Sequence, residues 1–96
     1  MKNLEFDIII DLRSKKDFTE DMLFYSQKNL EVINLDFFEA PKEVDKLDKT
    51  KSYLVVCDTG MFSDIIAKVM QSKGFKNVKS LNGGIKNLKK LLNEKE

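Results

Sequence analysis

Short apolar runs alternate along the chain with segments in which hydrophobic residues recur every three or four positions. The apolar runs predict buried strands at residues 7–12, 32–35, 53–57 and 78–81. The three-to-four-residue spacing predicts helices at residues 15–25, 41–47, 64–73 and 85–92. Strands that alternate with helices are typical of βαβ units. We therefore expect an α/β fold: a small, doubly wound parallel sheet of four strands, or five if residues 4–6 add one, with helices on both faces.

Polar residues and glycines predict where these helices begin and end. Ser14 is placed to cap the first helix, and Pro41 suits the first position of the second. Ser63 is expected to cap the third helix, and Gly74 to end it in a left-handed conformation.

Composition restricts the chemistry that this chain can perform. Its 96 residues, 42% hydrophobic and 34% charged, predict one globular domain spanning residues 1–96. With one cysteine and no histidine, the chain has no internal disulfide, no Cys/His zinc cluster and no imidazole base. We predict neither a metal nor a cofactor.

Charge and hydropathy also restrict the partners. The net charge of +1 gives no general attraction to nucleic acid, so no nucleic-acid partner is predicted. The longest apolar runs, residues 8–10 and 53–57, are far shorter than a membrane-spanning helix, and the first residues do not resemble a signal peptide. We therefore expect a cytoplasmic protein without a membrane partner. The sequence makes no prediction of oligomeric state.

Cys57 is the best candidate for a reactive group. It ends the most apolar strand, and ligands of open α/β sheets bind beyond the carboxyl ends of the strands. Gly60 lets the following loop curl so that its backbone N–H groups point inward, beside the start of a helix. Such a loop stabilises a thiolate, which is the nucleophilic form of cysteine. The alternative is that Cys57 is simply a small buried hydrophobic residue.

Three motifs follow one another in the order and spacing of a known family. The first is a strand followed by Asp11 and Arg13, and then by an acid and an aromatic residue, at 17–18. The second is Cys57 with glycine three positions later and serine six positions later. The third is Gly-Phe-x-x-Val at 74–78, followed by Leu-x-Gly-Gly-Ile at 81–85. Together they resemble the rhodanese domain family, whose members pass sulfane sulfur through a cysteine persulfide.

The resemblance implies a sulfurtransferase and a set of site residues. Cys57 is the expected catalytic nucleophile, attacking a small sulfur donor or a persulfidated protein and passing the sulfur to a thiol or cyanide acceptor. The expected substrate-binding loop around the sulfur comprises Asp58, Thr59, Gly60, Met61, Phe62 and Ser63. Met61 and Phe62 are expected either to line a pocket or meet a partner, or to pack into the core of the domain.

The loop departs from the family in a way that bears on the donor. Active rhodaneses typically carry Arg or Lys there, whereas this loop has Asp58 and no cation. A carboxylate about 7 Å from the sulfur opposes the thiolate by about 0.6–2.4 kcal/mol, whereas a helix N-terminus favours it by about 0.3–1 kcal/mol. We therefore expect thiosulfate, a dianion, not to be the preferred donor.

The same departure keeps a second function open. A non-enzymatic rhodanese-fold module, serving as a sulfur relay or a regulatory protein-interaction domain, also fits a loop without a cation. The related phosphatase and arsenate-reductase members need an arginine at the end of their loop, and Arg13 lies far from this loop in sequence. For Arg13 we expect a local ion pair with Asp17, and for Asp11 a role in fixing nearby backbone.

Overall fold

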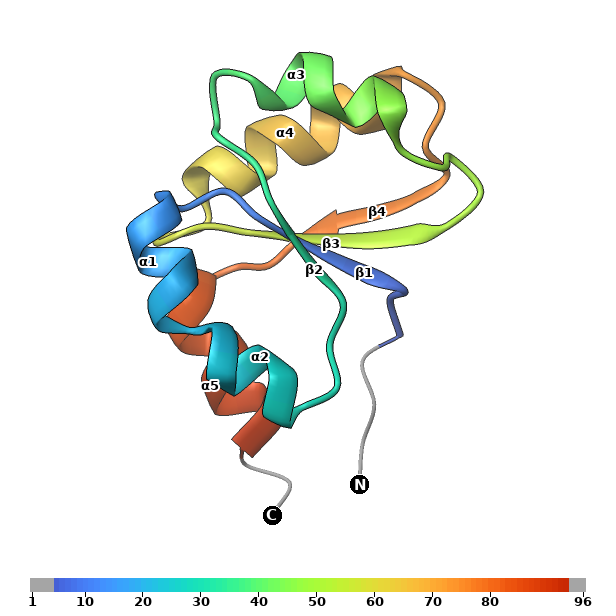
Figure 1. Cartoon of the computed structure of the whole chain (residues 1–96). Coiled ribbons are helices and arrows are strands. Elements are labelled where there is room, and N and C mark those ends of the chain that lie inside the picture. Colours follow the sequence, from blue (N-terminus) through green and yellow to red (C-terminus); the bar gives the residue numbers. More distant parts are fainter. Residues whose placement is uncertain (1–4, 94–96) are drawn as a thin grey trace.

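The computed structural model describes residues 5–93, and they form one layered α/β structure (Figure 1). The strands are β1 (Ile8–Asp11), β2 (Val32–Asn34), β3 (Ser52–Val56) and β4 (Asn77–Ser80). The helices are α1 (Lys15–Glu20), α2 (Met22–Gln27), α3 (Ala40–Glu43), α4 (Met61–Ser72) and α5 (Gly84–Asn93), and a 3₁₀ turn, Val44–Lys46, continues α3.

The four strands form a parallel sheet in the order β2-β1-β3-β4. Helices α3 and α4 cover one face, and α1, α2 and α5 cover the other (Figure 1). This arrangement confirms the predicted α/β class with helices on both faces. Of the predicted additional strand at 4–6, Leu4 lies outside the described residues, and Glu5 and Phe6 are not in a strand.

The apolar strand runs exist because both faces of the sheet are buried. In β1, Ile8 and Ile10 pack into the cluster under α3 and α4, whereas Ile9 packs into the cluster under α2 and α5. In β3, Val55 and Val56 divide between the same two clusters. Alternate side chains of a strand point to opposite faces, so an unbroken apolar run supplies two cores at once.

The first predicted helix is interrupted at Asp21. The Ser14 side chain caps α1 as expected, accepting a hydrogen bond from the Asp17 N–H at 3.2 Å. The backbone of Asp21 then leaves the helical conformation (φ −105°, ψ 9°), and α2 begins at the next residue. The second predicted helix starts with Pro41 in its first turn, but it tightens into the 3₁₀ turn after Glu43.

The prediction for the start of the third helix was wrong. Helix α4 begins at Met61, and Gly60 (φ +107°) precedes it, so Ser63 lies inside the first turn and is not the cap. Gly74 (φ +102°) ends this helix as predicted: its N–H donates to the Gln71 carbonyl, and the Phe75 N–H donates to the Met70 carbonyl. None of the helices among residues 5–93 has the length and apolar character needed to cross a bilayer.

Candidate functional site

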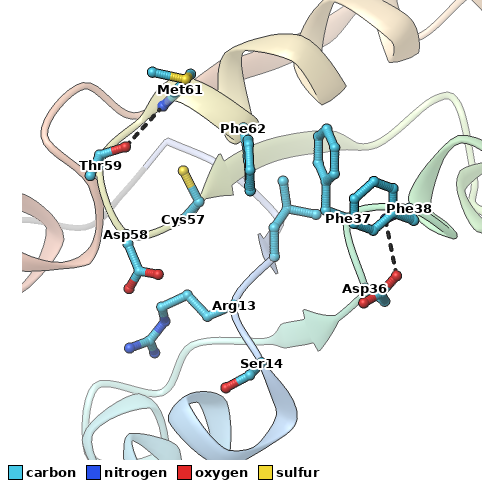
Figure 2. A pocket seen from close by; sticks show the side chains of 11 residues that line it. Arg13, Ser14, Asp36, Phe37, Phe38, Cys57, Asp58, Thr59, Met61 and Phe62 are labelled. Atoms are coloured by element: carbon cyan, nitrogen blue, oxygen red, sulfur yellow. Dashed lines mark hydrogen bonds between the residues drawn. The ribbon is translucent and has the colours of Figure 1, made fainter.

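Cys57 lies at the point where the strand order of the sheet reverses direction. The chain passes from β1 to β2 on one side and returns to β3 on the other, so the carboxyl ends of β1 and β3 meet at a crevice. A pocket of about 460 Å³ opens there (Figure 2). Its lining comes from the segments after β1, β2 and β3: Leu12, Arg13, Ser14, Asp36, Phe37, Phe38, Cys57, Asp58, Thr59, Met61 and Phe62.

Two backbone N–H groups of the loop point at the Cys57 sulfur. The Gly60 N–H donates to Sγ at 3.0 Å, and the Ser63 N–H, in the first turn of α4, donates at 3.4 Å. The residue is 4% exposed. Burial acts to raise the pKa of the thiol, but hydrogen bonds from Ser63, and then from the Gly60 and Thr59 backbone, outweigh it and leave the pKa below its ordinary value. The loop therefore favours the thiolate.

The position of Gly60 requires glycine twice over. Its φ of +107° is in the left-handed region, and a Cβ there would lie 3.3 Å from both the Gly83 nitrogen and the Leu81 carbonyl oxygen. The loop after β3 is thus pressed against the turn after β4. The residue at this contact is the one whose N–H donates to the sulfur.

The start of α5 supports the same loop from behind. The Ile85 N–H donates to the Cys57 carbonyl at 2.9 Å. Gly84 packs so closely against Asp58 that a Cβ would lie within 2.6 Å of the Cys57 carbonyl oxygen. The Gly-Gly-Ile segment of the third motif is therefore a backbone platform under the sulfur-bearing loop.

Ser63 acts through hydrogen bonds in the interior, not as a lining residue. Its hydroxyl donates to the Gly60 carbonyl at 3.1 Å and shares a 2.7 Å hydrogen bond with the Ser80 hydroxyl at the end of β4. These bonds tie the loop and the first turn of α4 to the neighbouring strand. Ser80 was not predicted as a site residue, although ligands of parallel sheets bind at the carboxyl ends of the strands and Ser80 is the last residue of β4.

The other predicted loop residues face the solvent or the pocket. Asp58 and Thr59 are exposed and line the pocket, and the Thr59 hydroxyl oxygen accepts a 3.5 Å hydrogen bond from the Met61 N–H (Figure 2). Met61 and Phe62 are 68% and 45% exposed and also line the pocket. Of the two expectations for this pair, packing into the core is wrong.

Aromatic side chains form one side of the pocket, a wall that was not predicted from the sequence. Phe37 stacks on Phe62 with ring centroids 4.2 Å apart and contacts Phe38 edge-on at 5.1 Å. In Figure 2 these rings lie on one side of Cys57, and Asp58 and Thr59 lie on the other. Phe37 and Phe38 follow β2, whose carboxyl end lies at the same edge of the sheet. Their position directly after a predicted strand was the sequence feature that could have indicated a place in the site.

Arg13 lines the pocket, but its positive charge is paired with carboxylates away from the sulfur. Its guanidinium contacts the Asp11 carboxylate at 2.9 Å and the Asp21 carboxylate at 2.8 Å, and in Figure 2 its side chain points away from the Cys57 sulfur. Lys89 of α5 contacts Asp21 at 2.7 Å. The expected ion pair between Arg13 and Asp17 is wrong, because the interruption at Asp21 turns a different carboxylate toward the guanidinium.

Asp11 anchors this group of charges at the end of β1. Its carboxylate, fully buried, accepts from the Arg13 backbone N–H at 2.9 Å and from the Tyr25 hydroxyl at 2.7 Å. Asp11 thus fixes nearby backbone as expected. Burial and the hydrogen bond to Asp11 raise the pKa of Tyr25. Burial opposes ionisation of Asp21, but Lys89 and Arg13 hold its pKa below the ordinary value.

Metal coordination has no obvious location in the part of the chain that the structure describes. No group of three or more Cys, Asp or Glu side chains there is arranged to hold a metal ion. Cys57 is a free thiol.

Comparison with known proteins places the chain in a family. The sequence model of the rhodanese-like domain matches residues 1–91, and the chain belongs to that family. Among curated proteins, it is 37% identical over 78 residues to a tRNA sulfurtransferase of Haemophilus ducreyi and 34% identical over 74 residues to one of Actinobacillus succinogenes. These matches cover 81% and 77% of the chain but 16% and 15% of the relatives, so the chain spans about a sixth of their length.

Solved structures agree with the family. A rhodanese-like domain from Anabaena superposes with a TM-score of 0.69 at 17% identity, covering 88% of this chain and 91% of the other. An NAD-dependent persulfide reductase from A. fulgidus superposes with a TM-score of 0.66 at 28% identity, covering 86% of this chain and 14% of that one.

Proposed function

We propose that this chain is a sulfurtransferase that carries sulfane sulfur as a persulfide on Cys57. The observation that carries the proposal is the pair of N–H groups, from Gly60 and Ser63, that donate to the sulfur at the edge of an open pocket. Donors that stabilise a thiolate also suit the anionic persulfide that replaces it. The tRNA sulfurtransferase relatives support sulfur transfer as the type of reaction.

Loading is a displacement at sulfur that needs no cofactor. The Cys57 thiolate attacks the terminal sulfur of a donor R–S–SH, and a new sulfur–sulfur bond forms as the one in the donor breaks. The donor leaves as the thiolate R–S⁻, and the proton stays on the new persulfide or passes to solvent. Transfer to an acceptor reverses this sequence, and Cys57 returns to the thiolate. The chain then acts by covalent catalysis with one nucleophile.

The electrostatics of the pocket favour an organic persulfide, whose sulfur carries at most one negative charge, over the dianion thiosulfate as the donor. Among the described residues, Arg13 supplies the cation of the lining, and Asp11 and Asp21 already neutralise it. Asp36 and Asp58 add exposed carboxylates to the same lining. A dianion thus meets no uncompensated positive charge near the sulfur.

The test is the intact mass of the reduced protein after incubation with an organic persulfide or with thiosulfate. We expect the organic persulfide to add one sulfur atom to the wild type and none to Cys57→Ser, and thiosulfate to load the wild type more slowly. A mass gain in Cys57→Ser would place the sulfur elsewhere. Equal loading by the two donors would overturn the electrostatic preference.

The second function, a non-enzymatic relay or interaction module, has its own supporting observation. Cys57 is 4% exposed, which restricts the approach of a donor. If neither donor adds sulfur and iodoacetamide also fails to alkylate Cys57 in the native protein, the interaction module is the better description. Loading of Cys57 followed by transfer to an added thiol would support the enzyme.

A further inference from the structure

Exposed apolar side chains gather around the mouth of the Cys57 pocket. Phe38 is 81% exposed, Met61 68%, and Phe62 and Ile65 each 45%. Met61 and Ile65 lie four residues apart on α4, so they share one side of that helix. Exposed apolar residues that gather around a reactive group mark a surface that contacts something else. We refer to Phe38, Met61, Phe62 and Ile65 as the apolar rim.

The two aromatic members of the rim, Phe38 and Phe62, are packed in place before anything binds. Phe62, at the start of α4, stacks on Phe37, which follows β2, and Phe37 in turn holds Phe38 edge-on (Figure 2). Aromatic side chains in such contacts lose little further entropy when a partner covers them. The rim is therefore a ready contact surface.

The rim extends beyond what a small thiol covers. A small molecule in the pocket contacts the lining residues, but it leaves Ile65 in water, because Ile65 is not part of that lining. It also covers only part of Phe38, a lining residue that is 81% exposed. A segment of a protein that enters with its thiol covers both. The carboxylates of Asp36 and Asp58 add negative charge that Arg13, already paired, does not offset. That charge suits a basic segment.

We propose that the apolar rim docks the sulfur acceptor, and that this acceptor is a cysteine in a partner protein, flanked by apolar side chains and at least one basic residue. The inference deepens the proposed function and rests on it. Once the partner is docked, its thiolate attacks the outer sulfur of the Cys57 persulfide. The new bond joins that sulfur to the partner, the bond to Cys57 breaks, and Cys57 leaves as the thiolate. The partner gains the persulfide, and no external oxidant or reductant is consumed.

The experiment starts from protein already persulfidated on Cys57, so that transfer is measured apart from loading. The acceptors are a basic apolar peptide, Lys-Phe-Cys-Leu-Lys, an acidic polar peptide, Glu-Ser-Cys-Ser-Glu, and benzyl mercaptan as a small neutral thiol. We expect the basic apolar peptide to accept sulfur at least about tenfold faster than the acidic one, after correction for thiolate fraction.

Variants connect that preference to the rim. Ile65→Ser should slow transfer to the basic apolar peptide by about tenfold and leave the rate with benzyl mercaptan unchanged, because Ile65 is outside the pocket lining. Leu23→Ser is the matched control, since Leu23 is 68% exposed on α2, away from the pocket. It should alter neither rate. Equal rates with the two peptides, or a peptide preference that survives Ile65→Ser, would overturn the proposal. Benzyl mercaptan accepting sulfur as fast as the basic peptide would point to a small-molecule acceptor instead.

A binding measurement separates this proposal from the sulfur chemistry. The same basic peptide with serine in place of cysteine cannot accept sulfur, but it should shift the NMR resonances of Phe38, Met61 and Phe62 and do so less in Ile65→Ser. If Cys57 never loads, the proposed function fails, and these shifts still decide whether the rim docks such a segment. Absence of shifts at millimolar peptide would refute docking even in a protein that loads sulfur normally.

Discussion

At the scale of single residues, the loop that holds the sulfur depends on positions where a side chain is missing. Gly84 lies so close to the carbonyls of Cys57 and Asp58 that no Cβ fits, and its φ of +69° is unfavourable for other residues. The Ile85 N–H, one residue further, holds the Cys57 carbonyl. Backbone atoms at the start of α5 therefore hold Cys57 in position directly, with no side chain between them.

Gly84→Ala should therefore damage stability and site together. We expect a loss of about 2–4 kcal/mol in the free energy of unfolding, combining left-handed strain with a backbone clash, and an altered Cys57 alkylation rate. Urea unfolding at neutral pH measures the first, and mass spectrometry after iodoacetamide measures the second.

Gly74→Ala is the control for Gly84→Ala. Gly74 also has a positive φ, +102°, but a Cβ there would meet only the Lys49 side chain, 3.8 Å away. Gly74→Ala should lower the free energy of unfolding by about 1–2 kcal/mol and leave the Cys57 alkylation rate unchanged. Equal costs for the two glycines would show that the backbone behind the loop yields easily.

At the scale of elements, charged groups join β1, the α1–α2 junction and α5. Asp21 lies between the two helices and holds both Arg13 and Lys89. Because Arg13 also binds Asp11, the end of β1 is connected to α5 through two carboxylates and two cations. Such pairs contribute more to the free energy of unfolding than surface ion pairs do, because the side chains of Arg13 and Asp21 are only 6% and 14% exposed.

Asp21→Asn should destabilise the protein in a pH-dependent way. The pKa of Asp21 is lower in the folded chain than its ordinary value of 3.8, so its contribution is present above that pH and is lost as the pH falls through the folded pKa. We expect a cost of about 1–3 kcal/mol at neutral pH that shrinks toward about pH 3. Urea unfolding of both proteins at the two pH values measures it.

Asp64→Asn provides the comparison for the Asp21 variant. Asp64 pairs with Lys68 one turn along α4, at 3.3 Å, with both side chains more than half exposed. Its loss should cost less than about 0.5 kcal/mol. A pH-independent cost for Asp21→Asn would mean that the side chain matters for shape and not for charge.

The elements show which parts of the fold the sequence predicts. Strands were predictable because their apolar runs serve two cores, as in Ile8–Ile10. The break at Asp21 was not, because apolar spacing continues past it to Tyr25, whose hydroxyl reaches Asp11 across the structure. Ser63 has the local features of a cap, but its hydroxyl bonds to the Gly60 carbonyl and to Ser80, a residue 17 positions away. Long-range partners decide such cases.

At the scale of the whole molecule, the setting of Cys57 is assembled from distant segments. The loop after β3 supplies N–H donors, the start of α5 supports them, and the segment after β2 supplies the aromatic wall. Sequence motifs predicted the loop, because the residues that form it are adjacent along the chain. They did not predict the wall, because only the sheet order brings Phe37 to Phe62.

Unfolding should remove the shift in the Cys57 pKa completely. In the native protein, the N–H donors outweigh burial, so the midpoint of the thiol titration should lie below the ordinary value of 9.0. In concentrated urea it should return to that ordinary value. The pH dependence of iodoacetamide alkylation, followed by intact mass, gives both midpoints. Identical midpoints would indicate that the loop does not act on the sulfur.

The solitary thiol has a consequence for how long the persulfide proposed for Cys57 would last. Cys57 is the single cysteine of this chain, so no neighbouring cysteine within it can displace the outer sulfur by closing a disulfide. The proposed persulfide would then be discharged by a thiol from outside this chain, and its lifetime would depend on the concentration of that thiol.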